Sequence, residues 1–179
     1  MKRSVAFGLC ALPLLLASAT AALAIELPIR KAGLWELKMG RAGAAGDDVA
    51  MQHCTDETTD KKMVSSFQPL SNEVCSKQDT QKTATGYVTD AVCSIAGMTT
   101  TSRSEITGDF NSAYTVKVTS HNDKPLPGVP KDATMTLDAK WLGPCKSGQR
   151  PGDIVMPGGI KMNIADIEKL KALMPKPPK

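Results

Sequence analysis

Apolar and polar residues alternate one by one along much of the middle of the chain. The clearest run covers residues 133–141, where Ala, Met, Leu, Ala and Trp stand at every second position between polar residues. Residues 33–39 and 114–119 show the same period. Because successive side chains of a strand point to opposite faces of a sheet, each run predicts a strand with one apolar and one polar face. The threonine-rich stretch 98–107 also favours a strand, since β-branched residues pack well on a pleated surface.

Turn-forming residues separate these runs. Residues 108–111 (Gly-Asp-Phe-Asn) form a turn signal, residues 122–131 contain three prolines and a glycine, and residues 40–46 form a small-residue loop. Antiparallel sheets commonly bury one face and leave the other in water, as this alternation requires. We therefore expect an α+β fold that is mostly β. It would be a curved antiparallel meander of about six to eight strands, shaped as an open barrel or a sandwich-like sheet.

Two segments favour helices. A short helix is expected after Cys54, with Thr55 as its N-cap and the acidic pair Asp56-Glu57 in its first turn. A second helix should begin after Asn163 as N-cap and end before Pro175. The expected apolar stripes comprise Met63, Phe67 and Leu70 in the first helix, and Ile164, Ile167, Leu170 and either Leu173 or Met174 in the second.

Residues 1–24 have the three parts of a cleavable signal peptide. Lys2 and Arg3 form the basic start, residues 5–17 form an apolar stretch too short to span a bilayer, and residues 22–24 (Ala-Leu-Ala) fit a cleavage site. The alternative is a buried or membrane-anchoring N-terminal helix. The pattern favours export, so we expect an exported protein that has no transmembrane segment after cleavage.

The chain that follows the signal has the length of one ordinary domain. We expect a disulfide-linked β-rich domain over residues 25–156, and a linker, a C-terminal helix and a basic tail over residues 157–179. Loss of Lys2 and Arg3 lowers the formal net charge from +4 to +2. A nucleic-acid-binding face needs clustered basic residues, and here they are scattered, so we expect no nucleic acid partner.

Four cysteines follow the signal: Cys54, Cys75, Cys93 and Cys145. They allow three disulfide connectivities. Cys75 and Cys93 flank two strand-like runs with an expected turn at their midpoint, residue 84, so they would lie opposite each other in a hairpin. That leaves Cys54 to pair with Cys145. Zinc and redox sites are weaker alternatives, because zinc favours close ligand pairs and a redox site favours C-x-x-C.

No catalytic motif is visible. The serines lie outside any G-x-S-x-G motif, and His53 and His121 lie outside any recognisable nucleophile motif. The nine methionines raise copper binding as an alternative, since thioethers bind Cu(I), but most fall in strand or helix patterns that favour core packing. We therefore expect no enzyme activity, no catalytic residues, no metal site and no cofactor. An active site assembled from scattered residues is the open alternative.

Several motifs, taken in order, carry a family resemblance. Residues 33–36 (Gly-Leu-Trp-Glu) open the series, Cys54, Cys75 and Cys93 follow, and residues 141–145 (Trp-Leu-Gly-Pro-Cys) close it. Over residues 30–156 or so, the chain resembles the small exported Gram-negative bacterial proteins grouped as domain of unknown function 3617. The resemblance implies an exported, β-rich, cysteine-linked domain, and it supplies no catalytic residues.

A curved antiparallel sheet can hold an apolar ligand on its concave face or at its mouth. Our leading hypothesis is a non-enzymatic periplasmic module that binds a small apolar molecule or an envelope protein, as a monomer or weak oligomer. The alternative is a structural or interaction protein that docks through its C-terminal helix. The residues expected to line an apolar ligand surface, unless they simply form the core, are Trp35, Leu37, Met135, Leu137 and Trp141.

Overall fold

The computed structural model of the 179-residue chain describes residues 25, 27–42, 49–95, 97–124 and 127–173, without the side chains of residues 66–70, 168 and 170–173. The predicted signal peptide therefore lies outside the described residues. The helices are α1 (Glu57–Val74), the short 3-10 helix η1 (Pro157–Gly159) and α2 (Ile164–Leu173). The strands are β1 (Gly33–Arg41), β2 (Val49–Thr55), β3 (Cys75–Lys82), β4 (Gly86–Ile95), β5 (Met98–Asp109), β6 (Ala113–Asn122), β7 (Asp132–Gly143), β8 (Asp153–Val155) and β9 (Lys161–Asn163).

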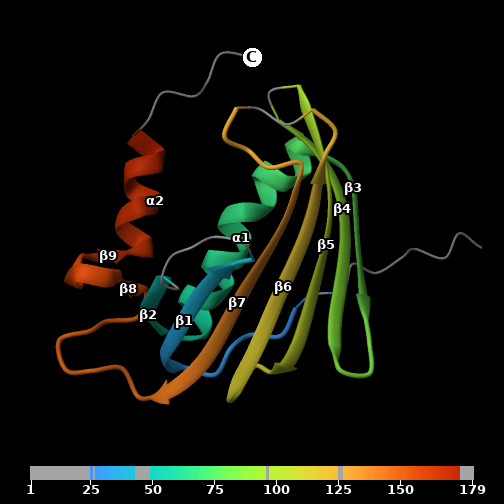
Figure 1. The fold of residues 1–179 in the computed structure, drawn as a ribbon. Helices are drawn as coiled ribbons and strands as arrows, with labels where there is room; N and C mark the ends of the chain where they lie inside the picture. Colours follow the sequence, from blue (N-terminus) through green and yellow to red (C-terminus); the bar gives the residue numbers. More distant parts are fainter. Residues whose placement is uncertain (1–24, 26, 43–48, 96, 125–126, 174–179) are drawn as a thin grey trace, which may run out of the picture.

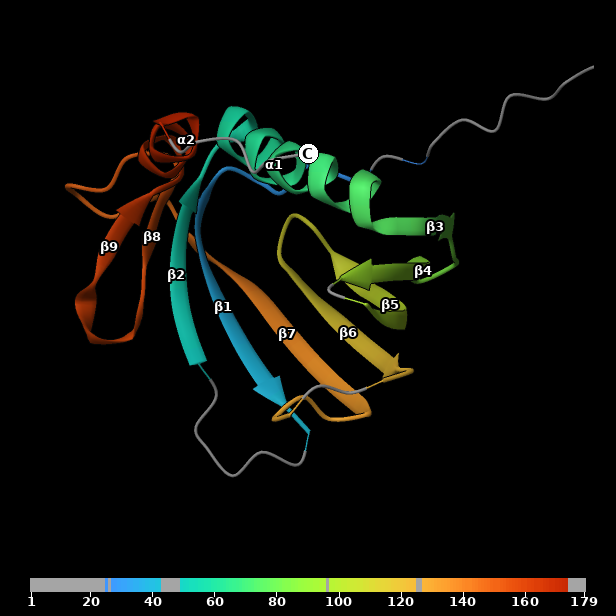
Figure 2. The ribbon, with the colours of Figure 1, turned by 90° about the horizontal axis from the view of Figure 1, so that it is seen from above.

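The nine described strands form one antiparallel sheet in the order β3-β4-β5-β6-β7-β1-β2-β8-β9. The sheet is curved but not closed, and α1 crosses its opening from β2 to β3 (Figures 1 and 2). The predicted fold class is thereby confirmed, including a helix after Cys54 and another near the C-terminus. The first strand of the chain, β1, lies inside the sheet between β7 and β2, so the N-terminal sequence forms part of its centre.

The two faces of the sheet differ in character. The inner face, which we define as the one turned toward α1, carries Trp35, His53 and Tyr114, because these side chains surround Arg30 where it contacts Asp60 of α1. Register partners and every second residue along a strand share that face. The core lies there. It consists of buried Trp35, Leu37 and Ala139, with Met51, Tyr114, Leu137 and Trp141 packed against them.

The outer face carries the polar half of the predicted alternation. Glu36 of β1 is paired in register with Lys140 of β7, and Lys38 is paired with Asp138. On β6, Thr115 donates a hydrogen bond to Asp138 over 2.7 Å. The strands predicted over residues 33–39, 114–119 and 133–141 thus correspond to β1, β6 and β7, with their apolar residues directed inward.

The β3–β4 hairpin contains the predicted disulfide between Cys75 and Cys93, whose Cα atoms lie 3.8 Å apart. From Lys77 to Lys82 the strands pair in a register that would place Cys75 opposite Ser94. A β-bulge at Ser76 shifts the register by one residue and brings Cys75 opposite Cys93. The pairing deduced from the midpoint is therefore confirmed, although it depends on an irregularity that the midpoint does not reveal.

The predicted disulfide between Cys54 and Cys145 is also present, with Cα atoms 5.4 Å apart. It links Cys54 of β2 to the segment just after β7, across the start of β1, since Leu34 pairs with Cys54 of β2 and with Gly143 of β7. The preceding residue, Gly33, has a φ of 132° and approaches β7 so closely that a Cβ atom there would collide with the carbonyl oxygen of Gly143. The opening glycine of the G-x-W motif is thus required by this close approach.

The helix α1 begins one residue later than predicted. Its N-cap is Asp56, whose carboxylate accepts a hydrogen bond from the backbone N–H of Thr59 over 2.8 Å, while the Thr59 hydroxyl accepts one from the N–H of Asp56 over 3.0 Å. The expectation of Thr55 as N-cap was wrong because Thr55 is the last, buried residue of β2. Either residue type can cap a helix, so the end of the strand decides which one does. The predicted side chains Phe67 and Leu70 lie outside the described ones.

The C-terminal segment adds to the sheet before it forms α2. Strand β9, within the segment expected to contain a linker, pairs with β8. The buried Asp153 of β8 receives hydrogen bonds from Asn163 and from the N–H of Arg150, and forms an ion pair with Lys161 over 2.8 Å. Burial alone would raise the pKa of Asp153, but these partners outweigh it and lower the pKa to about 2. Asn163 caps α2 as predicted, because its side chain accepts a hydrogen bond from the N–H of Ala165.

Candidate functional site

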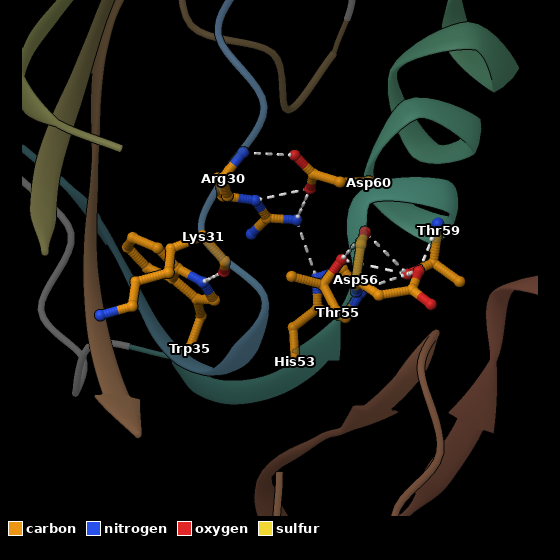
Figure 3. Close-up of polar contacts among 8 residues, drawn as sticks. All are labelled: Arg30, Lys31, Trp35, His53, Thr55, Asp56, Thr59 and Asp60. Atoms are coloured by element: carbon orange, nitrogen blue, oxygen red, sulfur yellow. Dashed lines mark hydrogen bonds and ion pairs between the residues drawn. The ribbon is translucent and has the colours of Figure 1, made fainter. Parts of the chain in front are cut away.

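Three buried polar residues meet at the base of the inner face, where the segment before β1 passes α1 (Figure 3). The backbone N–H of Arg30 donates to Asp60 over 2.8 Å, its Nε donates to the same carboxylate over 2.7 Å, and Nη2 forms an ion pair with it. Nη2 also lies 3.0 Å from Nδ1 of His53 on β2. All three residues are almost fully buried. This cluster, Arg30–His53–Asp60, joins the N-terminal segment, β2 and α1.

The His53 ring is neutral. Burial, followed by the charge of Arg30, lowers the pKa of His53 to about 4, and Asp60 opposes this shift. A guanidinium group can only donate hydrogen bonds, so Nδ1 accepts from Arg30 and the proton of the neutral ring sits on Nε2. Nε2 is buried and has no hydrogen-bond partner among the described residues. Since the cluster is closed to solvent, it is suited to hold the base of the fold and lacks the access that a substrate would need.

Aromatic rings extend this closed base along the bottom of the sheet. Trp35 lies 5.6 Å from Tyr114, Tyr114 stacks on Phe110 at 4.8 Å, and Phe110 meets Tyr87 edge-on at 6.3 Å, measured between ring centroids. Burial raises the pKa of the Tyr114 hydroxyl, which keeps it protonated at neutral pH. The N-terminal segment is fixed to this end, because Lys31 donates its N–H to the carbonyl of Phe110 and accepts a bond from the indole of Trp35.

The opposite end of the inner face is apolar and only partly covered. Met135 is 39% exposed although β7 is the middle strand of the nine, and Val49 at the start of β2 is 43% exposed. Half-buried apolar side chains on β1, β6 and β7 lie beside them on the same face. We define these residues together as the apolar band: Met39, Val49, Val116, Val118, Met135 and Leu137.

The structure separates the five residues expected to line a ligand surface. Trp35 and Leu37 are buried in the core, and Leu137 and Trp141 are half-buried against it. Trp141 is further covered by the ammonium group of Lys31, 3.6 Å from its ring centroid. Met135 is the one member of the five that is exposed. Two of the five, Met135 and Leu137, thus belong to the apolar band.

A shallow hollow of about 480 Å³ lies on the outer face of β5, β6 and β7. It contains two polar pairs, Arg103 with Asp90 at 3.0 Å and His121 with Asp132 at 2.7 Å. Each pair is largely solvated, and Arg103 also contacts Glu105. Among the described residues, no group of three or more His, Cys, Asp or Glu side chains is arranged to hold a metal ion.

Sequence reasoning missed Arg30 and Asp60 and treated His53 as an ordinary strand residue. Asp60 stands 30 positions from Arg30 along the chain, and His53 stands 23 positions from it. Only Asp60 had a local signal, because it is an acidic residue in the first turn of a helix. Acidic residues are favoured there by the helix dipole, so this signal did not point to a buried partner. The four members of the apolar band that were not predicted to line a ligand surface are Met39, Val49, Val116 and Val118. They follow from the register once β1 is known to lie between β7 and β2, with β6 on the other side of β7.

The fold and this arrangement define a class: an open, disulfide-linked antiparallel sheet with a helix across its opening, a closed polar base and an apolar inner face. Residues 30–145 match the family model described as "Protein of unknown function (DUF3617)", and the chain belongs to that family. No curated protein and no solved structure matches the chain. Within the part that the structure describes, no helix is both long enough and apolar enough to cross a bilayer.

Proposed function

We propose that this protein is a non-enzymatic binding module that holds a small apolar molecule on the apolar band. The observation that carries the proposal is the exposure of Met135, an inner-face residue on the central strand of the sheet. Apolar side chains at such positions are normally buried, and exposed apolar patches mark binding surfaces. Trp35, Leu37 and Ala139, nearer the base of the same face, form the core, so the band is the apolar part of that face that can contact a ligand.

The proposal places the protein in the periplasm after removal of residues 1–24. Both disulfides support an oxidising compartment, because such bonds are rare where thiols are kept reduced. They also support a preformed site. Each disulfide links neighbouring parts of the curved sheet, so the inner face keeps its shape in the absence of a ligand.

Native mass spectrometry of protein isolated gently from the periplasm tests this function. Met135→Asp places a charge on the inner face, and Thr136→Asp places the same charge one residue away on the outer face of the same strand. The wild type and Thr136→Asp should carry an additional small mass that organic solvent extracts, whereas Met135→Asp should lose it. Bare protein in all three samples, with extracts equal to those of an unrelated periplasmic protein, would contradict the proposal.

A second candidate, docking to an envelope protein, is favoured by exposed apolar residues in the C-terminal segment. Ile160 is 65% exposed, and Met162 of β9 and Ile167 of α2 are also exposed. The variant Ile160→Ser/Met162→Ser leaves the inner face unchanged and tests this candidate. Loss of a stoichiometric periplasmic complex in that variant, together with no small mass on the wild type, would favour docking over ligand binding.

A further inference from the structure

We infer that the ligand of the apolar band is a long-chain anionic amphiphile with a single carboxylate head group, and that Arg41 binds this head group. The inference rests on the proposed function and names the chemical class of its ligand. It comes from the position of one cation at the open end of an otherwise uncharged surface.

Arg41 is the last residue of β1 and pairs in register with Met135 of β7. Register partners share a face, so the Arg41 side chain projects from the inner face beside the exposed thioether of Met135. In Figure 2, β1 begins close to α1 and its arrowhead, which ends at Arg41, lies far from the helix. The end of β1, and Arg41 with it, thus lies at the rim where the inner face opens.

Charge is otherwise nearly absent from this surface. On β4, β5, β6 and β7, every described inner-face position is uncharged. The other ionisable inner-face group on β1 and β2 is His53, which is neutral and buried at the base. Lys82, the inner-face cation of β3, lies on the edge strand of the sheet, so a ligand on the band would meet Arg41 at one end of its apolar contacts.

Arg41 has no carboxylate partner among the residues that the structure describes, and it is exposed. Other arginines differ in this respect: Arg30 pairs with Asp60, Arg103 with Asp90, and Arg150 with Asp166. A guanidinium matches one carboxylate through two parallel N–H···O hydrogen bonds. One unpaired guanidinium therefore favours a ligand with one negative charge.

The shape of the apolar surface favours an alkyl chain. The band runs from the rim, at Val49 and Met135, to Leu137 and Val116, and ends where the core begins at Leu37 and Ala139. On its other side, β5 presents the hydroxyl groups of Ser102 and Ser104 to the inner face. The apolar surface is therefore a strip that leads inward from Arg41, and it suits a chain whose charged end remains at the rim.

The test uses the full exported protein, freed of any co-purified lipid, and three probes: palmitate, its methyl ester and the uncharged dye N-phenyl-1-naphthylamine. The dye reports the apolar band, and displacement of the dye measures the affinity for palmitate and for the ester. Arg41→Gln removes the charge, and Arg41→Lys retains it. Arg103→Gln makes the same change as Arg41→Gln on the outer face and is the matched control.

The affinity for palmitate, measured by displacement of the dye, should be at least about tenfold higher than the affinity for the methyl ester. The reason is that hydrogen bonds to charged groups contribute more than those between neutral groups. Arg41→Gln should remove this difference and leave dye binding unchanged. Arg41→Lys should preserve most of the difference, and Arg103→Gln should preserve all of it.

The outcomes separate this inference from the proposed function. If the dye binds but palmitate is no better than its ester, or if Arg41→Gln leaves the difference intact, the inference is overturned while an apolar site stands. If neither the dye nor palmitate binds, the proposed function itself fails and the inference fails with it.

Discussion

Arg30, His53 and Asp60 are polar, yet they are buried together at the base of the fold. Removing polar groups from water costs free energy unless they are hydrogen-bonded and charges are paired. The two oxygens of Asp60 and the ring nitrogen Nδ1 of His53 meet this requirement through Arg30. Nε2 of His53 is the exception, and acid would add a second proton to the ring at Nδ1, which faces the Arg30 guanidinium in a buried site.

At the residue scale, we predict that His53 makes the protein less stable as the pH falls from about 6.5 to about 4. The pKa of His53 is about 4 in the folded protein, against 6.5 for an ordinary histidine. The unfolded chain therefore takes up a proton first, so the folded state is fully stable above the unfolded pKa and is progressively disfavoured below it. The shift corresponds to about 3 kcal/mol.

Urea unfolding of the wild type and His53→Gln at pH 7.5, 5.5 and 4.5 measures this dependence. The variant should be less stable at pH 7.5, because packing and a hydrogen bond are perturbed, but its stability should fall less steeply toward pH 4.5. His121→Gln is the control, because the His121–Asp132 pair is solvated and surface pairs contribute little. Parallel curves for the wild type and His53→Gln would show that another group controls the acid response.

The residue scale is also where sequence reasoning was least complete. Trp35 and Leu37 were recognisable as inner-face residues from the alternation alone, and burial assigns them to the core. The alternation could not indicate that Met135, in an equally regular run, would be left 39% exposed. Exposure depends on which element covers a position, and no local pattern contains that information.

At the element scale, the chain's irregularities determine where its strands and helices meet. The capping box of Asp56 and Thr59 stops the helix from extending back into β2, and the bulge at Ser76 brings Cys75 opposite Cys93. Both features lie at junctions between elements. At the first, the end of β2 at Thr55 leaves Asp56 to cap the helix; at the second, one additional residue in β3 shifts the register. Such boundaries are the part of a secondary-structure prediction that sequence determines least.

For the two disulfides, we predict that the Cys54–Cys145 bond contributes more to stability than the Cys75–Cys93 bond. The first joins residues 91 positions apart and the second joins residues 18 apart. On the chain-entropy account, these loop lengths correspond to about 4.5 and about 3 kcal/mol. The variants Cys54→Ala/Cys145→Ala and Cys75→Ala/Cys93→Ala, compared by urea unfolding, measure the difference.

Part of the effect at Cys54 could come from packing, because Cys54 is fully buried. Reducing the wild type with dithiothreitol breaks both bonds without removing side-chain atoms and provides the control for that loss. Equal unfolding midpoints for the two variants, or a larger loss for Cys75→Ala/Cys93→Ala, would show that loop length does not control their contributions.

At the scale of the whole molecule, the sheet joins parts of the chain that lie far apart in sequence. β1 is held between β7 and β2, and the sheet continues through β8 to β9. The Asp153 carboxylate, with its low pKa, binds Lys161 and Asn163, so the segment after residue 156 supplies partners to a buried charge. Our division of the chain at residue 156 stays a prediction, which truncation can test.

We predict that a chain ending after Met156 is less stable than the full chain by about 3 kcal/mol, because the buried Asp153 would lose Lys161 and Asn163 and keep Arg150 alone, whose Nε lies 3.7 Å away. A chain ending after Ala165 keeps β9, the cap residue Asn163 and the buried Ile164, and should unfold close to the full-length protein. Thermal and urea unfolding of the three chains measure this. If both truncated chains match the full chain, the domain ends at residue 156 after all.

The sequence by itself determined most of the elements of this protein, because alternation, caps and turn residues act over a few neighbouring positions, but β9 lies where it indicated a linker. It also determined the disulfide partners, since the spacing of Cys75 and Cys93 about a turn left one pairing for the others. The tertiary structure alone decided that β1 lies between β7 and β2, that Arg30 and Asp60 meet, and that Arg41 stands beside Met135 at an open rim. These contacts join residues distant in sequence, and their formation depends on the curvature of the whole sheet and the path of α1 across it.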